Sequence, residues 1–226
     1  MQNIFENYGI QLNKEQSEKF ENYYKLLVYF NEKFNITAIT DKEEVYKKHF
    51  VDSLLGKNMF ISGKLIDVGS GGGFPAIPNK IVNDELDIIM LEATGKKCEF
   101  LNTVIMELDL KNIIVINGRA EDFSKKEEYR EKFDYASARA VAGLNILSEY
   151  CLPFVKKGGH FIAFKGQAEE EIINSKKAID ILGGKIDNVY EFSLEGAKRE
   201  IIDIVKIKNT PSLYPRSNAK IRKSPI

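Results

Sequence analysis

Hydrophobic residues recur with a helical period over the first 60 residues of the chain. The positions that repeat at i, i+3, i+4 and i+7 are Phe20, Tyr23, Tyr24 and Leu27. Asn13 is the expected N-cap of this helix, and Asp41 is expected to cap a second helix while Glu44 reaches back to the cap. The segment FNITAIT (34–40) between the two helices is rich in β-branched residues and predicts a connector. We therefore expect residues 1–60 to form a helical cap packed on the main domain.

From Lys64 the pattern changes to short apolar strands that alternate with helical segments. The expected strands are 65–68, 86–91, 112–116, 133–138 and 160–164, and the expected helices are 96–108, 144–155 and 168–182. This alternation predicts an α/β domain, a mostly parallel sheet with helices on both faces. The segments 183–192 and 199–208 are separated by a short loop and predict a hairpin. We expect residues 61–226 to form this Rossmann-like domain, with an antiparallel strand at its end.

Charge is balanced over the whole chain but not along it. The 226 residues include 33 basic and 33 acidic side chains, so the formal net charge is zero. Six of the basic residues and none of the acidic ones follow Asp203, which gives residues 1–203 a formal charge of −6 and the remainder +6. Such asymmetry is typical of a phosphate-binding tail, and equally of a solubilising terminus. We treat residues 204–226 as a candidate basic tail.

Several classes of protein are disfavoured by what the sequence lacks. The two cysteines, Cys98 and Cys151, form no CxxC pair, and there are only two histidines, so we expect no structural metal and two buried thiols. The longest apolar run, Leu26 to Phe30, is far shorter than the roughly 20 residues that span a bilayer. Glu6 interrupts any apolar stretch after the N-terminal methionine. These features predict a cytoplasmic protein without a membrane span.

A glycine-rich segment, DVGSGGGFPAIP (67–78), directly follows the first expected strand. Gly69, Gly71 and Gly73 allow a tight turn and let a ligand lie against the backbone at the carboxyl end of the strand. Phe74 replaces the third glycine of the dinucleotide fingerprint G-x-G-x-x-G, which disfavours a nicotinamide oxidoreductase. The absence of G-K-[ST] excludes a Walker loop. A plain strand-to-helix turn remains the alternative.

Acidic residues follow the second and third expected strands. Glu92 ends the second strand, where its carboxylate can accept hydrogen bonds from ribose hydroxyls, although it can also simply cap the next helix. The segment NGRAEDF (117–123) follows the third strand, and groups around Ala120 and Glu121 can read an adenine edge. These positions share the edge of the sheet where open α/β folds bind ligands.

Arg139 lies in SARAVAGL (137–144), after the fourth expected strand. Its small neighbours make a purely structural role hard to explain, and a ligand contact is one interpretation. The other is a buried salt bridge to Asp67 or Glu121.

Several of these motifs together resemble the bacterial small-subunit rRNA guanine-N7 methyltransferases, also called glucose-inhibited division protein B. They are DVGSGGGFPAIP, GRAED, SARAVA, FKG (164–166), YPR (214–216), FNITAIT and KKHFVDSLL (47–55). The resemblance runs from about residue 20 to the C-terminus. It implies a class I S-adenosylmethionine-dependent fold with a helical N-terminal cap. It also implies methyl transfer to N7 of one guanine, position 527, of 16S rRNA. By motif match, the implied cofactor contacts are Gly69, Phe74, Ala120, Glu121 and Arg139.

The chemistry of guanine N7 needs little from the protein. The atom has a lone pair and no proton, so we expect catalysis by positioning and electrostatics, with no catalytic residue assigned and Arg139 orienting cofactor or guanine. With Gly71 and Glu92 added, the expected cofactor site has seven residues. The RNA-binding candidates, of which the first two can equally be solvated surface charges, are Lys165, Arg199, Arg216, Lys220, Arg222 and Lys223.

The expected partner is 16S rRNA or the 30S subunit, with no DNA and no membrane, and the protein is expected to act as a monomer. From the residues alone, two other functions stay open. A small-molecule methyltransferase fits the glycine-rich loop but gives the tail no role. A non-enzymatic nucleotide- or RNA-binding module needs neither the site at the strand ends nor Arg139.

Overall fold

The computed structural model describes residues 2–226 and contains one seven-stranded sheet with the order β3-β2-β1-β4-β5-β7-β6. The strands are β1 (Gly63–Val68), β2 (Leu86–Glu92), β3 (Ile113–Asn117), β4 (Phe133–Arg139), β5 (Val155–Lys165), β6 (Gly184–Leu194) and β7 (Ala197–Lys206). The first five strands are parallel, and β7 is antiparallel to both of its neighbours. The predicted parallel sheet and its antiparallel hairpin are therefore confirmed.

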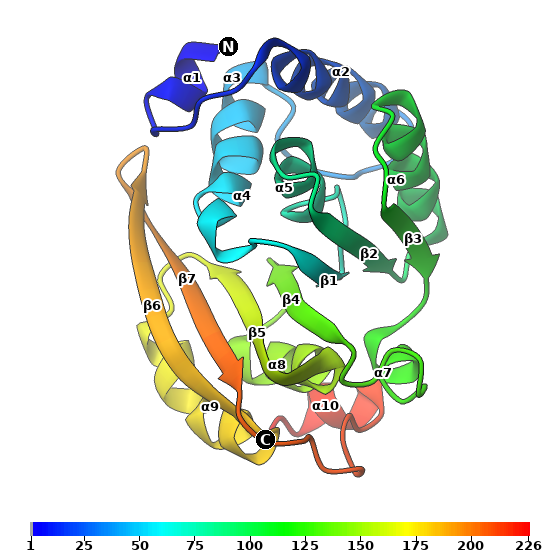
Figure 1. The fold of residues 1–226 in the computed structure, drawn as a ribbon, viewed down its shortest axis with the longest axis vertical. Coiled ribbons are helices and arrows are strands. Elements are labelled where there is room, and N and C mark those ends of the chain that lie inside the picture. Colours follow the sequence, from blue (N-terminus) through cyan, green and yellow to red (C-terminus); the bar gives the residue numbers. More distant parts are fainter. Residues whose placement is uncertain (1) are drawn as a thin grey trace.

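Helices cover both faces of the sheet. They are α1 (Gln2–Glu6), α2 (Lys14–Asn31), α3 (Lys42–Val45), α4 (Asp52–Leu54), α5 (Ala76–Val82), α6 (Gly95–Glu107), α7 (Ala120–Phe123), α8 (Leu144–Cys151), α9 (Glu169–Ile181) and α10 (Asn218–Lys223). In Figure 1 the sheet crosses the middle of the molecule, with α1 to α6 on one side and α7 to α10 on the other. Each layer has its own buried apolar cluster against the sheet.

The N-terminal helices begin where the capping residues predict. Asn13 Oδ1 accepts a hydrogen bond from the Gln16 amide at 2.8 Å, and the Gln16 side chain accepts one from the Asn13 amide at 3.0 Å. Asp41 caps α3 through the Glu44 amide at 3.0 Å. The Glu44 side chain does not reach back as expected. It pairs with Lys48 one turn later, since a cation at that spacing offers a stronger partner than a backbone amide.

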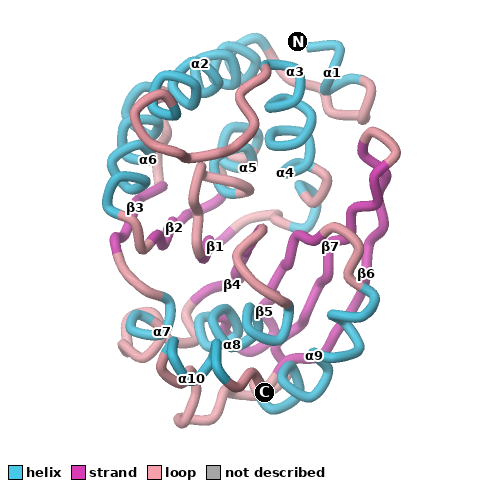
Figure 2. Tube along the Cα trace, turned by 180° about the vertical axis from the view of Figure 1, so that it is seen from behind, coloured by secondary structure: helices cyan, strands magenta, loops and turns pink. Residues whose placement is uncertain are grey.

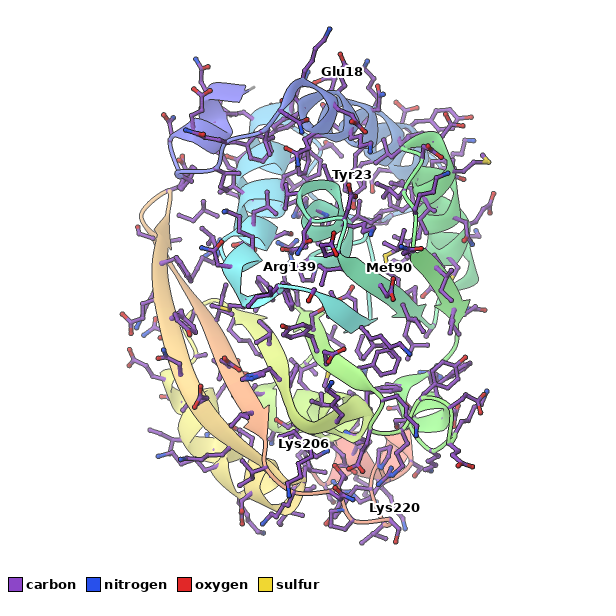
Figure 3. All side chains as sticks on the ribbon, viewed as in Figure 1. Glu18, Tyr23, Met90, Arg139, Lys206 and Lys220 are labelled. Atoms are coloured by element: carbon purple, nitrogen blue, oxygen red, sulfur yellow. The ribbon has the colours of Figure 1, made fainter. Side chains whose placement is uncertain are left out.

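The cap and the sheet share one core. The Tyr23 ring of α2 stacks on Phe50 at 5.1 Å between centroids, and lies 5.6 Å from Phe74 and 6.4 Å from Phe100. Its hydroxyl donates a hydrogen bond to the carbonyl of Gly72, in the loop after β1. Figure 3 shows Tyr23 directed from α2 toward this loop. The cap thus helps to fix the loop that follows the first strand.

The β6–β7 hairpin reaches the cap from the other end of the sheet. Glu195, in its turn, accepts a hydrogen bond from the Tyr8 hydroxyl at 3.0 Å and pairs with Lys47 at 2.9 Å. Figure 1 and Figure 2 both show the hairpin tip close to α1. These exposed contacts join the hairpin turn to the N-terminal helices and stabilise the protein only slightly.

The largest error in the predicted boundaries lies before β5. The helix expected over 144–155 ends at Cys151, is followed by a 3-10 turn (Leu152–Phe154), and gives way to a strand that begins at Val155 instead of residue 160. Pro153 explains the early end, because it has no amide hydrogen to continue the helix. Within residues 2–226, no helix is long and apolar enough to cross a membrane.

Candidate active site

A cavity of about 430 Å³ opens at the carboxyl ends of β1 to β4. It is lined by all seven residues predicted to contact a cofactor: Gly69, Gly71, Phe74, Glu92, Ala120, Glu121 and Arg139. These residues follow or end four different strands, and the first and last of them, Gly69 and Arg139, are 70 positions apart in sequence. Their meeting in one cavity follows from the parallel sheet, whose strands all end at the same edge.

The glycine-rich loop forms the floor of the cavity. Gly69, Gly71 and Gly73 all have positive φ angles, of 73°, 56° and 88°, which residues with a Cβ rarely adopt. A Cβ on Gly73 would lie 2.6 Å from both the Tyr23 hydroxyl and the Ile77 side chain. A Cβ on Gly71 would meet only the Gly69 carbonyl, at 3.8 Å, and would otherwise project toward the cavity that Gly71 lines. The loop therefore offers bare backbone to a ligand.

Glu92 ties the loop to the next strand. Its Oε2 accepts a hydrogen bond from the Gly71 amide at 2.9 Å, and its Oε1 accepts one from the Thr94 amide at 2.8 Å. Thr94 is the N-cap of α6, so the capping role considered for Glu92 is present. Because a carboxylate has about four acceptor positions, two remain for a ligand in the cavity. Glu92 therefore makes structural contacts to the loop and to the start of α6, and its ribose contact stays a prediction.

Asp67 is a buried carboxyl group two residues before Gly69. Its Oδ1 accepts a hydrogen bond from Ser137 at 2.6 Å, whereas its Oδ2 has no partner among the described residues. Burial raises the pKa of Asp67 to about 7. An unpartnered buried carboxylate oxygen is costly, and a cationic group or water that reached it would relieve that cost. Asp67 is 1% exposed and does not line the cavity, so its carboxyl group is a buried neighbour of the loop and not a contact for a ligand.

Arg139 pairs with neither of the two acids that the sequence suggested. Its Nη1 bonds Asp52 Oδ2 at 2.6 Å, and Arg199 Nε bonds the other oxygen of the same carboxylate at 2.7 Å. Asp52 comes from α4 in the cap, and no local pattern links it to β4 or β7. The alternative interpretation, a salt bridge of Arg139, is therefore wrong in its partner, which is Asp52 and not Asp67 or Glu121. Figure 3 shows Arg139 near the centre of the molecule, between α4 and the sheet.

His49 and Thr37 also line the cavity, although the sequence did not single them out. The His49 ring stacks on Phe74 at 4.6 Å between centroids, and Arg139 lies 5.0 Å from the same Phe74 ring. His49 belongs to a π-helical turn (Tyr46–Val51) between α3 and α4. Such turns are frequent at functional sites, but they leave no signature in the hydrophobic period. The one available signal was that both residues lie in the motifs FNITAIT and KKHFVDSLL.

Three of the six RNA-binding candidates are held by the protein itself. Lys165 pairs with Glu171 at 2.6 Å and donates to the Ala142 carbonyl. Arg199 binds Asp52, and Arg216 pairs with the buried Glu149 at 2.6 Å. These side chains are partly buried, so only those of their N–H groups that are not bonded within the protein could contact a large polyanion.

The other three candidates lie together on α10. Lys220, Arg222 and Lys223 are exposed, and none makes an ion pair with any residue of the described chain. Arg222 also lines the cavity, together with Asn218 and Tyr150. Figure 1 and Figure 2 place α10 beside α7 and α8. This helix is the part of the tail that joins the cavity to a basic surface.

The tail charge of +6 overstates what is available at the surface. Lys206 belongs to β7, is buried, and lies 3.3 Å from Glu131, and burial lowers the pKa of its ammonium to about 8. Lys208 pairs with Asp180 at 2.9 Å. With Arg216 also paired, half of the tail's cations are balanced by acids of the body.

The part of the chain that the structure describes contains no group of three His, Cys, Asp or Glu side chains placed to hold a metal ion. Cys98 and Cys151 are both buried, as predicted, and burial raises the pKa of each thiol. Neither cysteine belongs to the cavity lining.

Comparison with known proteins identifies close relatives. The model of the family described as rRNA small subunit methyltransferase G matches residues 16–202. A protein named ribosomal RNA small subunit methyltransferase G from Acetivibrio thermocellus is 49% identical, over 97% of this chain and 92% of its own length. A protein of the same name from Clostridium botulinum is 47% identical, over 96% of this chain and 94% of its own.

Solved structures share the fold at much lower identity. A SAM-dependent methyltransferase from Aquifex aeolicus superposes with a TM-score of 0.53 and 15% identity, over 73% of this chain and 94% of that one. The likeness, together with the strand order, shows the class I methyltransferase fold. The predicted fold class is confirmed.

Proposed function

The chain belongs to the rRNA small subunit methyltransferase G family, and from this premise we propose that it methylates N7 of one guanine, position 527, of 16S rRNA. S-adenosylmethionine is the methyl donor. The observation that carries the proposal is the single cavity at the strand ends, which gathers all seven residues expected to contact that cofactor. The substrate is ribosomal RNA, and it locates the proposed activity in the cytoplasm.

The residues present fit an adenosine derivative. The Gly69–Gly73 loop offers backbone without side chains, and Glu92 retains acceptor positions for ribose hydroxyls. Ala120 and Glu121 line the cavity after β3, which supports their proposed contact with the adenine. When bound, S-adenosylmethionine supplies an electrophilic methyl group on a sulfonium.

The chain's own contribution to the reaction is positioning. Guanine N7 has a lone pair and no proton, so no general base is needed. His49 is the histidine in the cavity, but burial and the charge of Arg139 lower its pKa to about 4, and its Nδ1 faces the Arg139 guanidinium at 3.0 Å. It is therefore a neutral structural group. Arg139, fixed by Asp52, orients the reactants, and no residue forms a covalent intermediate.

Positive charge around the cavity supports the choice of RNA as substrate. Arg222 lines the cavity, and Lys220 and Lys223 lie on the same helix, α10. The Asp52–Arg139–Arg199 group adds one unbalanced positive charge through Arg139, which also lines the cavity. Phosphate contacts of this kind position an RNA without reading its sequence. We further propose that residues 1–60 act as a cap over the methyltransferase domain of 61–226, and that the protein works as a monomer.

The proposal is tested by labelled methyl transfer. Purified protein and methyl-labelled S-adenosylmethionine are incubated with 30S subunits that lack the modification, with naked 16S rRNA, and with transfer RNA as control. We expect label in 16S rRNA from one or both of the first two substrates and none in the third. Calorimetric titration should show binding of S-adenosylmethionine and none of NAD. Label in small molecules or transfer RNA alone would contradict the proposal.

A further inference from the structure

Thr37 carries a hydroxyl group in the wall of the cavity. Thr37 lies in the connector between α2 and α3 and lines the cavity with His49, Phe74 and Arg139. Its Oγ1 accepts a hydrogen bond from the Ile39 amide at 3.1 Å. It also lies 2.8 Å from Nε2 of His49.

The direction of the hydrogen bond between Thr37 and His49 follows from Arg139. Arg139 Nη2 lies 3.0 Å from His49 Nδ1, and the Lys48 carbonyl lies 3.1 Å from the same nitrogen. The guanidinium can only donate, and the carbonyl already accepts a hydrogen bond from Arg139 Nη1 at 3.2 Å, so we assign Nδ1 as the acceptor of the charged donor. The ring is neutral near pH 7 because its pKa is lowered to about 4. A neutral imidazole that accepts at Nδ1 carries its proton on Nε2, and this proton is donated to Thr37 Oγ1.

Both acceptor positions of the Thr37 hydroxyl are therefore filled. One is used by the Ile39 amide and the other by His49, which leaves the hydroxyl proton as its remaining hydrogen-bonding capacity. With the proton of His49 on Nε2, the hydroxyl proton has no hydrogen-bond acceptor among residues 2–226. A ligand in the cavity can supply one. Because both acceptor positions are occupied, the hydroxyl can accept a hydrogen bond from a ligand only if it loses its bond to Ile39 or to His49.

The position of Thr37 suits the methyl-accepting base better than the cofactor. Glu92 and Ala120–Glu121 follow β2 and β3, on one side of β1, whereas Arg139 follows β4, on the other side. Thr37 is joined to Arg139 through His49. If the adenosine lies on the Glu92 side, the β4 side is left for the base that receives the methyl group.

We propose that Thr37 makes the site specific for guanine over adenine by donating its hydroxyl hydrogen to O6 of the target base. This inference rests on the proposed function. Guanine presents two acceptors, N7 and O6, along the edge that must face the methyl group, whereas adenine presents N7 beside an amino donor. A donor at O6 leaves the N7 lone pair free to attack. The same donor opposes the amino group of adenine, because two donors cannot pair.

The test compares protein variants and target bases in single-turnover methyl transfer. The variants are Thr37→Val, which loses the hydroxyl, Thr37→Ser, which keeps it, and Thr40→Val as a control on the exposed part of the same connector. The substrates are small subunits assembled with guanine or 2-aminopurine at the target, since 2-aminopurine keeps N7 but lacks O6. Thr37→Val should slow transfer to guanine by about 10- to 100-fold, with Ser and the control within a few-fold of wild type.

The role of Thr37 is decided by whether the effects of Thr37→Val and of replacing guanine by 2-aminopurine depend on each other. The wild-type protein should be slower on 2-aminopurine by a similar factor, and Thr37→Val should then cause little further loss, because the bond is already gone. Equal slowing of both bases by Thr37→Val would overturn the inference, as would a weakened S-adenosylmethionine affinity without any change in base preference. Thermal unfolding checks that each variant is folded. No transfer to guanine by the wild type would overturn the proposed function together with the inference.

Discussion

His49 is a half-buried imidazole held between the Phe74 ring and the Arg139 guanidinium. Burial and that neighbouring charge lower its pKa to about 4, against roughly 6.5 in an unfolded chain. Between these values the unfolded chain binds more protons than the native protein, so the contribution of His49 to stability is present above pH 6.5 and is lost as the pH falls toward 4. We predict that the free energy of unfolding, measured with urea, falls more steeply over this range for wild type than for His49→Gln.

The second histidine gives the control for this pH effect. His160 is half-exposed on β5, pairs with Asp203 at 2.7 Å, and does not line the cavity. A His160→Gln variant keeps His49, so between pH 6.5 and 4 its free energy of unfolding should still fall more steeply than that of His49→Gln. Parallel pH profiles for wild type and His49→Gln would show that His49 is not the titrating group.

At the scale of the elements, Asp52 joins three of them. Its carboxylate holds Arg139 of β4 and Arg199 of β7 against α4. We predict that Asp52→Asn lowers the free energy of unfolding by about 1–3 kcal/mol, because two partly buried guanidinium groups lose their counter-charge. The same variant should slow methyl transfer, since Arg139 loses its anchor. Denaturant titration and labelled methyl transfer measure the two effects.

An exposed ion pair provides the comparison for Asp52. Asp180 pairs with Lys208 at the surface, at 2.9 Å. Its replacement by Asn removes the same charge and should cost less than about 1 kcal/mol. If Asp52→Asn and Asp180→Asn destabilise the protein equally, then Asp52 is not the link between cap and sheet.

The strand-end residues were predictable from the sequence, and the residues from the cap were not. Glu92 and Arg139 each end a strand, and parallel strands bring such positions to one edge of the sheet. Asp52 bonds partners 87 and 147 positions away in sequence, and Thr37 meets Arg139 only through His49. The helical period of the cap predicts its buried face, but not which polar side chains point from it into the cavity.

At the scale of the whole molecule, the net charge is zero although one surface is basic. This basic surface carries fewer unpaired charges than the tail sequence indicated. Lys206, Lys208 and Arg216 are paired with acids of the body, so α10 carries the exposed remainder. We predict that changing both Lys220 and Lys223 to Gln weakens binding to 30S subunits and lowers the slope of log affinity against log salt by about 1–2 units. Binding measured over a range of salt concentrations gives this slope.

The matched control removes two charges elsewhere. Lys176 and Lys177 are exposed on α9 and do not line the cavity. Their replacement by Gln changes the net charge by the same amount and should leave the salt slope near that of wild type. Equal slopes for the two double variants would mean that α10 has no special contact with phosphates.

The central claim is that the cavity delivers a methyl group to guanine N7 of 16S rRNA, and the most direct measurement locates the methylated atom. Guanine methylated at N7 becomes sensitive to borohydride reduction followed by aniline cleavage, and primer extension then maps the break. The account predicts one new break at a single guanine of 16S rRNA, which depends on both the protein and S-adenosylmethionine. Incorporation of label without any such break would place the methyl group on another atom and contradict the account.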